Sequence, residues 1–207
     1  ALPDGGTMTE DNTARRAYDI TADEFGPGRN GPLVIAVDIT QTTDVLEDLD
    51  AIADDIRVLD GVDSVGSPTP NPTIDTGIIQ VIPATGPSDP ATTDLVHRIR
   101  DLAPRIAEEY GTPIAVTGFT AVAIDISSKL NEALLPFGIV VVGLSIILLM
   151  MVFRSVVVPL KAAAGYLLSV LASFGICVAV FQWGWGAEAL HAVPGPLLSF
   201  MPILLMA

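Results

Sequence analysis

The spacing of apolar residues divides the chain into two parts. Up to residue 132, charged or polar side chains interrupt the apolar positions every few residues. Residues 133–153 then contain no charge, and a second uncharged run covers residues 162–187. A helix rises 1.5 Å per residue, so the first run is ~32 Å long, which matches the ~30 Å hydrocarbon core of a bilayer. The pattern predicts a water-soluble part followed by two transmembrane helices, at residues 134–153 and 162–185.

Within the soluble part, a pattern of strand, helix and strand occurs twice between residues 33 and 118. Runs rich in β-branched residues predict strands at 33–40, 62–66, 77–82 and 113–117. Helical periods of apolar residues predict helices at 42–60 and from Ser88 onward. The segment SPTPNPT (67–73) is expected as a stiff, extended linker. Two consecutive βαβ units predict an α+β domain of the ferredoxin-like, split βαβ kind, with an antiparallel sheet and two helices on one face.

The remaining segments are expected to connect these parts. Residues 1–32 form an N-terminal helix and loop leading into the 33–118 domain, and residues 119–133 form a connecting helix that enters the first span. The loop 154–161 joins the spans, and an external loop (186–196) leads to residues 197–207, an apolar run too short to cross a bilayer. We interpret this run as the first part of a further helix, which is typical of a segment of a longer polytopic protein.

Charge separates the two parts as clearly as hydropathy does. Residues 1–133 hold 23 acidic and 8 basic residues, whereas residues 134–207 hold two cations, Arg154 and Lys161, and one anion. Both cations lie in the loop 154–161. The positive-inside rule therefore predicts that this loop is cytoplasmic and that the acidic domain lies on the extracytoplasmic side of the plasma membrane. The acidic surface argues against a nucleic-acid partner, because it would repel phosphates.

The sequence carries no recognised pattern for catalysis or metal binding. His97 and His191 lack a His or Cys partner at metal-ligand spacing. The acidic residues of the helix at 44–60 lack the glycine-punctuated loop of a calcium site and are expected as a solvated face. No nucleophile elbow, P-loop or dinucleotide fingerprint occurs. Since Cys177 is the only cysteine, an intrachain disulfide is excluded. We expect no cofactor and no enzymatic activity.

The first candidate site is the turn where the soluble domain meets the first membrane helix. It comprises Thr117, Gly118, Thr120 and Asp125. A strand end, a glycine turn and a helix with Thr120 as its N-cap explain these residue types without any further function. Their position makes them candidates for a hinge, since movement of the domain would pass through them to the membrane helix.

The second candidate site is a stripe of small residues in the second span. Gly165, Ser169, Ser173 and Cys177 recur every four residues, which places them along one helix face. Small side chains let a neighbouring helix approach closely, so this stripe is predicted to be a packing face. The alternative is a polar track for substrate or protons. It is weaker because neither span contains the carboxylates that mark proton relays.

Four sequence features together resemble the MMPL family of the resistance–nodulation–division transporter superfamily. They are FGPGRNGPL (25–33), VTGFTAVAID (116–125), FRSVVVPLKA (153–162) and SFMPILLMA (199–207). The resemblance implies that residues 33–118 are the first external porter domain and that the two spans are the second and third membrane helices. It also implies that residues 197–207 open the fourth. The family's proton-relay Asp-Tyr pair would lie beyond Ala207, so no relay residue is assigned.

The same resemblance implies a proton-driven secondary transporter that exports lipids or other hydrophobic molecules. Its partners would be membrane lipids, the hydrophobic substrate, and the remaining helices and second porter domain of the full-length protein, with a homo-oligomer left open. The alternative is a non-transporting membrane scaffold or assembly protein whose external domain binds a partner. Intramembrane carboxylates after Ala207 would favour the transporter.

The predicted orientation is testable with introduced cysteines, after Cys177 has been replaced by alanine. A cysteine at Ser155 should be unreachable by an impermeant thiol reagent in intact cells, because the loop 154–161 is predicted to be cytoplasmic. A cysteine at Ser67, in the acidic domain, should react. Labelling in the reverse order would overturn the topology.

Overall fold

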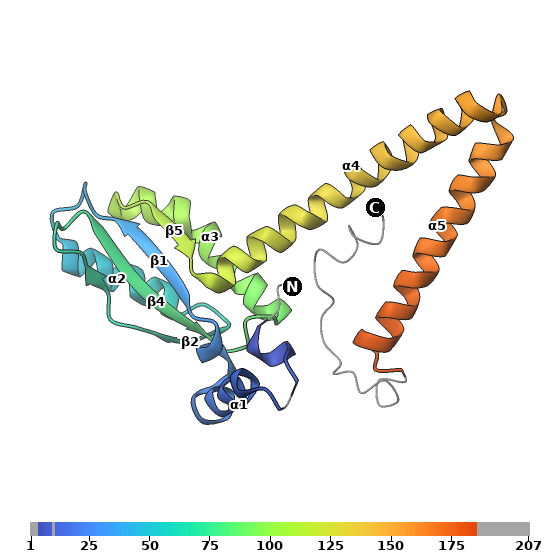
Figure 1. The fold of residues 1–207 in the computed structure, drawn as a ribbon. Coiled ribbons are helices and arrows are strands. Elements are labelled where there is room, and N and C mark those ends of the chain that lie inside the picture. The colour runs from blue at the N-terminus through green and yellow to red at the C-terminus, as the bar shows by residue number, and fades with distance from the viewer. Residues whose placement is uncertain (1–3, 10, 186–207) are drawn as a thin grey trace. The chain divides into compact units, whose positions relative to one another are not determined.

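The computed structural model describes residues 4–9 and 11–185 (Figure 1). The segments predicted at 186–196 and 197–207 lie outside the described residues. The chain divides into two compact units. One spans Pro3–Asp125 and mixes sheet and helix; the other contains the chain from Ile126 onward, including most of a pair of long apolar helices. The predicted order, a region of mixed helix and strand followed by two apolar helices, is confirmed.

The first unit is built on an antiparallel sheet. Its strands are β1 (Leu33–Asp38), β2 (Val62–Val65), β3 (Thr69–Pro70), β4 (Thr76–Pro83) and β5 (Ile114–Thr117). The strand order is β2-β4-β1-β5, with the short β3 also paired to β4. Helix α2 (Val45–Arg57) connects β1 to β2, and helix α3 (Pro90–Tyr110) connects β4 to β5. Each of these two connections therefore passes over one intervening strand.

The proline-rich segment 67–73 was predicted as a stiff, extended linker, but part of it joins the sheet. Thr69 and Pro70 pair with Ile78 and Gly77 of β4. The turn that follows is held by the Asn71 side-chain oxygen, which accepts hydrogen bonds from the backbone N–H groups of Asp75 (3.0 Å) and Thr76 (3.2 Å). Turn chemistry at Asn71 thus folds the segment back onto the sheet, where proline is tolerated because an edge strand leaves some N–H groups unpaired.

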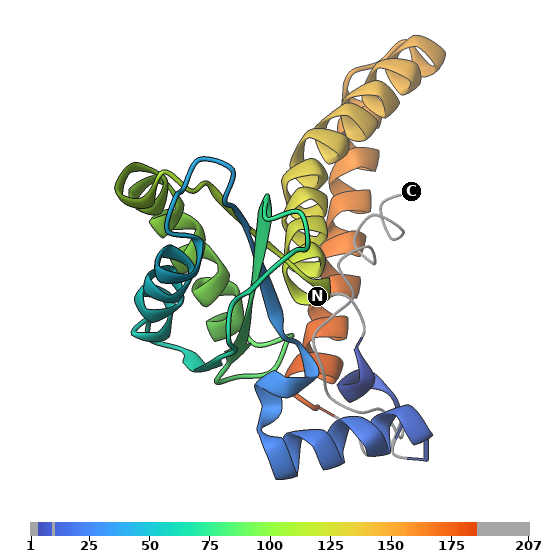
Figure 2. The same ribbon diagram turned by 90° about the vertical axis from the view of Figure 1, so that its left-hand side faces the viewer.

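Helices α2 and α3 cover the same face of the sheet (Figure 2). Alternate residues of β1 and β4 point to this face, as the strand period of two requires. The fully buried side chains of this core include Leu33, Ile35, Val37, Ile79 and Val81 from the sheet, Leu49, Ile52 and Ile56 from α2, and Leu95, Ile99 and Ile106 from α3. Burying one such side chain stabilises the fold by ~1.5–3 kcal/mol, so this layer is the main stabilising element of the unit.

The N-terminal segment packs onto the loop between β4 and α3. Helix α1 (Thr13–Phe25) is capped by Asn12, whose side chain accepts the Ala14 N–H at 2.9 Å. A short 3-10 helix, η2 (Pro27–Asn30), follows and brings Gly28 so close to β4 that a Cβ atom there would lie 1.7 Å from the Pro83 carbonyl oxygen. Near the start of the described chain, Asp4 accepts a hydrogen bond from the Ser88 hydroxyl at 2.8 Å.

The apolar part of the chain forms helix α4 (Phe119–Phe153) and helix α5 (Val157–Cys177), which continues as a π-helical turn, Val178–Gln182. Helix α4 includes both the predicted connecting helix and the predicted first span. Only Arg154–Val156 separate the helices, so the connection is shorter than the eight residues predicted. The prediction began the second span after Lys161, but a charge marks a membrane boundary rather than a helix boundary. Pro159 fits in the first turn of α5, where N–H groups lack helical partners.

The packing of residues 4–31 onto the sheet domain indicates that a fragment of residues 3–125 folds alone and shows both helix and strand by circular dichroism. Within it, Ile52→Ala should lower the free energy of unfolding by about 2–5 kcal/mol, because Ile52 is fully buried. Leu46→Ala on the same helix should change it by less than about 0.5 kcal/mol, because Leu46 is 66% exposed. Urea unfolding measures both values. A disordered fragment would contradict the prediction.

Candidate functional site

The predicted hinge begins at Thr117, the last residue of β5, and continues with Gly118, the only residue between β5 and α4. The φ of Gly118, 103°, lies in the region that favours glycine. The Gly118 carbonyl accepts the N–H of Val122 at 3.0 Å and so begins the hydrogen bonding of α4. A Cβ atom on Gly118 would lie 3.1 Å from the Pro32 carbonyl oxygen. The backbone conformation therefore favours glycine at this position, and a side chain would also make a tight contact with Pro32.

Thr120 does not cap α4, so that interpretation of the motif is wrong. The strand passes into the helix without a spare residue, and Thr120 is the second helical position. Its side chain is 1% exposed, and its hydroxyl has no hydrogen-bond partner among the described residues. It lies against Gly31 instead: a Cβ atom on Gly31 would be 2.6 Å from the Thr120 hydroxyl oxygen and 2.5 Å from the Cβ of Pro87.

The predicted hinge therefore lies at a junction of segments that are distant in the sequence. The loop before β1 contributes Gly31 and Pro32, the β4–α3 loop contributes Pro87, and the start of α4 contributes Thr120. Sequence analysis missed Gly31 and Pro87 as parts of this junction. The glycine-rich and proline-rich composition of residues 26–32 was a signal of close packing, but it did not identify the segment packed against them.

Asp125, the last predicted hinge residue, is bound by an arginine that sequence analysis did not select. Arg100 on α3 donates from Nη1 to Asp125 Oδ1 at 2.7 Å and from Nη2 to Asp125 Oδ2 at 2.8 Å. These hydrogen bonds raise the pKa of the Arg100 guanidinium above its ordinary value. Two parallel bonds from one guanidinium to one carboxylate fix the relative orientation of the groups as well as their distance.

The small-residue stripe of α5 lies on an open face of the helix. Gly165, Ser169 and Ser173 are exposed, and a Cβ atom on Gly165 would meet no atom of the described residues within 4 Å. The Ser173 hydroxyl donates to the Ser169 carbonyl of its own helix at 2.9 Å. Cys177 is half-buried at the end of α5. Packing of another helix on this stripe stays a prediction, and its partner would lie outside the described residues.

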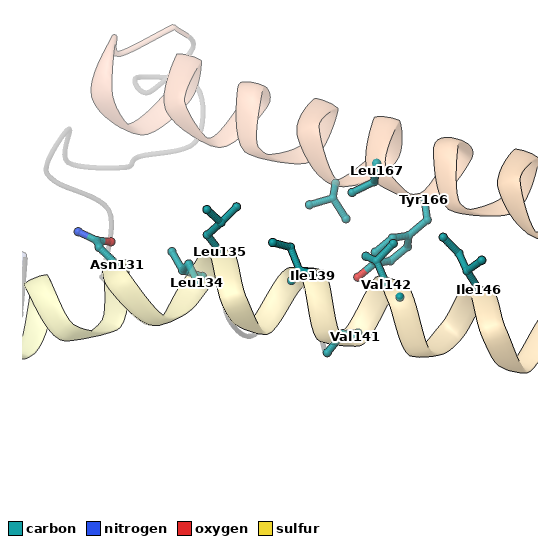
Figure 3. A pocket seen from close by; sticks show the side chains of 12 residues that line it. Asn131, Leu134, Leu135, Ile139, Val141, Val142, Ile146, Tyr166 and Leu167 are labelled. Atoms are coloured by element: carbon teal, nitrogen blue, oxygen red, sulfur yellow. The ribbon is translucent and has the colours of Figure 1, made fainter.

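A different face of α5 forms a cavity with α4. The cavity has a volume of about 620 Å³ and is lined by side chains of both helices (Figure 3). Leu135, Ile139 and Val142 line it from α4, and Tyr166 extends toward them from α5. Asn131 and Tyr166 are the only lining residues with polar side chains. The cavity is therefore suited to apolar molecules or apolar side chains. We call it the α4–α5 groove.

A second cavity, of about 530 Å³, lies where β1 ends and β4 begins, and Asp38 and Asp75 line it. Hydrogen bonds from Thr40 lower the pKa of Asp38 below its ordinary value, and hydrogen bonds from Asn71, Thr73 and Thr76 lower that of Asp75. Both carboxylates are therefore ionised at neutral pH. Within the described part of the chain, no three His, Cys, Asp or Glu side chains gather as a metal site would require.

These features define a membrane protein whose domain of mixed sheet and helix leads, without a linker, into a pair of apolar helices long enough to cross a bilayer. Residues 74–204 match the MMPL family, and the chain belongs to that family of transporters. The resemblance carried by the four sequence motifs is thus confirmed.

Several known proteins are similar over nearly the whole chain. Membrane protein YdfJ of Bacillus subtilis is 45% identical over 98% of this chain and 28% of its own length. The mycolic acid-containing lipids exporter MmpL11 of Mycolicibacterium smegmatis is 28% identical over 97% of this chain and 22% of its own. The heme uptake protein MmpL11 of Mycobacterium tuberculosis is 29% identical over 90% of this chain and 20% of its own. The chain thus spans between a fifth and about a quarter of these relatives.

The roles of backbone conformation and of close packing at Gly118 can be separated by comparison with Gly111, which ends α3. Gly111 has a φ of 68°, but a Cβ atom there would meet nothing within 4 Å. Gly111→Ala should cost ~1 kcal/mol of folding free energy, from backbone strain alone. Gly118→Ala should cost about 2 kcal/mol more, because overpacking against Pro32 adds to the strain. Equal costs in urea unfolding of residues 3–125 would contradict the packing argument.

Proposed function

We propose that this chain is part of a proton-driven secondary transporter that exports lipids or other hydrophobic molecules across the plasma membrane. The observation that carries the proposal is the direct passage from β5 through Gly118 into the 35-residue helix α4. With no flexible linker at this point, a rearrangement of the sheet domain on binding or releasing substrate is transmitted to the membrane helix. A tethered binding module would not need such a direct connection.

Within this proposal, residues 33–118 are a ferredoxin-like porter domain. The strand order β2-β4-β1-β5, the antiparallel pairing and the two helices on one face support this assignment. The connections β1-α2-β2 and β4-α3-β5 each pass over one strand, which is the split βαβ arrangement. The partners of the domain would be a second porter domain and the remaining membrane helices of a full-length, multi-pass protein.

The α4–α5 groove supports the hydrophobic class of substrate. Ten of its twelve lining residues have apolar side chains or are glycines. Two relatives, a lipids exporter and a heme uptake protein, differ in cargo and in the direction of transport. Both cargoes carry large apolar surfaces, so the relatives favour a chemical class rather than one molecule.

The orientation in the membrane follows from charge. Arg154 and Lys161 lie at the same end of the two apolar helices, which favours a cytoplasmic position for this end. Trp183 and Trp185 lie beyond the other end of α5, with ring centroids 5.9 Å apart. Tryptophan is enriched at the interfaces of a bilayer, so this end fits the opposite surface. The acidic domain would then be extracytoplasmic.

One observation favours the alternative of a membrane scaffold that does not transport. Residues 133–185 contain no aspartate or glutamate, although intramembrane carboxylates are the usual proton carriers. Proton coupling therefore requires carboxylates in helices outside the described residues.

Export of a fluorescent phospholipid analogue by the full-length protein tests the proposal. Export should stop when a protonophore dissipates the proton gradient. Val142→Trp should lower the export rate at unchanged protein abundance, because Val142 lines the α4–α5 groove. Val140→Trp is the matched control, since Val140 is on the same helix, is 64% exposed and does not line the groove. Absent export would favour the scaffold, whereas export that is insensitive to the protonophore would contradict proton coupling.

A further inference from the structure

Helix α3 makes two ion pairs with neighbouring helices, and they differ in geometry. Arg105 binds Asp55 of α2 through one nitrogen, Nη2, at 2.8 Å. Arg100 binds Asp125 of α4 through both terminal nitrogens, at 2.7 and 2.8 Å. The two arginines are therefore neighbouring cations on one helix. One binds a helix within the sheet domain, and the other binds the helix that continues into the apolar segment.

The Arg100–Asp125 pair is important because of where Asp125 lies in the chain. Asp125 is the last residue of the unit Pro3–Asp125, and the same helix continues into the next unit without a break. Before this point, α4 is held by Thr120 and Ala121, which are buried, and by Ile124, which packs against the core. The Arg100–Asp125 pair holds the helix about one turn beyond Ala121, at the end of the unit.

The Arg100–Asp125 pair contributes little to the stability of the fold, and its main effect is on the orientation of α4 relative to α3. Both side chains are partly exposed, at 32% for Arg100 and 51% for Asp125. Ion pairs at such positions contribute little to folding, because solvent screens them. The core of eleven fully buried side chains described above does not depend on them. A bidentate pair does, however, restrict the angle between two helices more than a single contact can.

We propose that Arg100 is a positioning residue that clamps the start of α4 to α3 and so couples movements of the sheet domain to the membrane helix. The functional part of this inference rests on the proposed function, and the structural part does not. Without the clamp, the domain keeps its fold, but α4 pivots about Gly118 and the buried contacts of Thr120 and Ala121.

The test uses the full-length protein with Cys177 replaced by alanine and spin labels on cysteines introduced at His97 and Ser128, both exposed. The distribution of distances between the labels reports the orientation of α4 relative to α3. Arg100→Gln and Asp125→Asn should each broaden this distribution, while the paired reversal Arg100→Asp with Asp125→Arg should narrow it again. Arg105→Gln is the matched control and should leave it unchanged.

Export and protein abundance are measured on the same variants. Arg100→Gln and Asp125→Asn should lower export about fivefold or more at unchanged abundance, in the range typical of coupling between sites. A distribution that stays narrow in Arg100→Gln, or one that the paired reversal fails to narrow, would overturn the clamp. If the distribution broadens in the two single variants while the unmodified protein shows no export, the clamp stands and the proposed transport function fails.

Discussion

A strand that becomes a long apolar helix after one glycine imposes a constraint on everything around it. At Gly118 the chain must change from extended to helical backbone in a single residue, with a φ of 103°. This change of backbone direction also occurs against the Pro32 carbonyl, with which a side chain would make a tight contact. The tight packing at Gly118 restricts the conformation of three neighbouring segments, which are the loop before β1, the β4–α3 loop and the first turn of α4. Since β5 is hydrogen-bonded to β1, the start of α4 is positioned by the sheet itself.

The junction also explains why small and rigid residues are concentrated in segments that are distant in sequence. Gly28 lies against Pro83, and Gly31 lies against Pro87 and Thr120. Glycine permits these close approaches, and proline limits the conformations open to the unfolded loops. The result is a small region of backbone-to-backbone packing next to the apolar core, with few side chains that are able to adjust. Such a region suits the transmission of movement, because displacement of one segment displaces its neighbours.

In the apolar helices, a different physical property decides which face packs against another helix. The fully buried side chains of the sheet domain lie on faces set by the strand and helix periods, whereas α4 and α5 are apolar around most of their circumference. In a bilayer, hydrophobicity does not select which face meets another helix, because lipid tails are as apolar as leucine. Side-chain size and shape select it instead. On α5, Tyr166, Leu167 and Val170 line the α4–α5 groove, whereas Gly165, Ser169 and Ser173 are exposed.

Periodicity and composition determined the local elements from the sequence alone: four of the five strands of the sheet, both of its helices, and the continuity of the connecting helix with the first apolar span. These depend on contacts between residues close in the chain, or on free energies of transfer that each residue contributes separately. Tertiary structure decided the features in which a local signal was ambiguous. The segment around Thr69 pairs with β4 because Asn71 closes a turn, Thr120 is buried rather than capping because Gly31 approaches it, and Arg100 binds Asp125 across 25 positions. No local pattern marks such pairs, because each depends on where the completed fold brings two distant segments together.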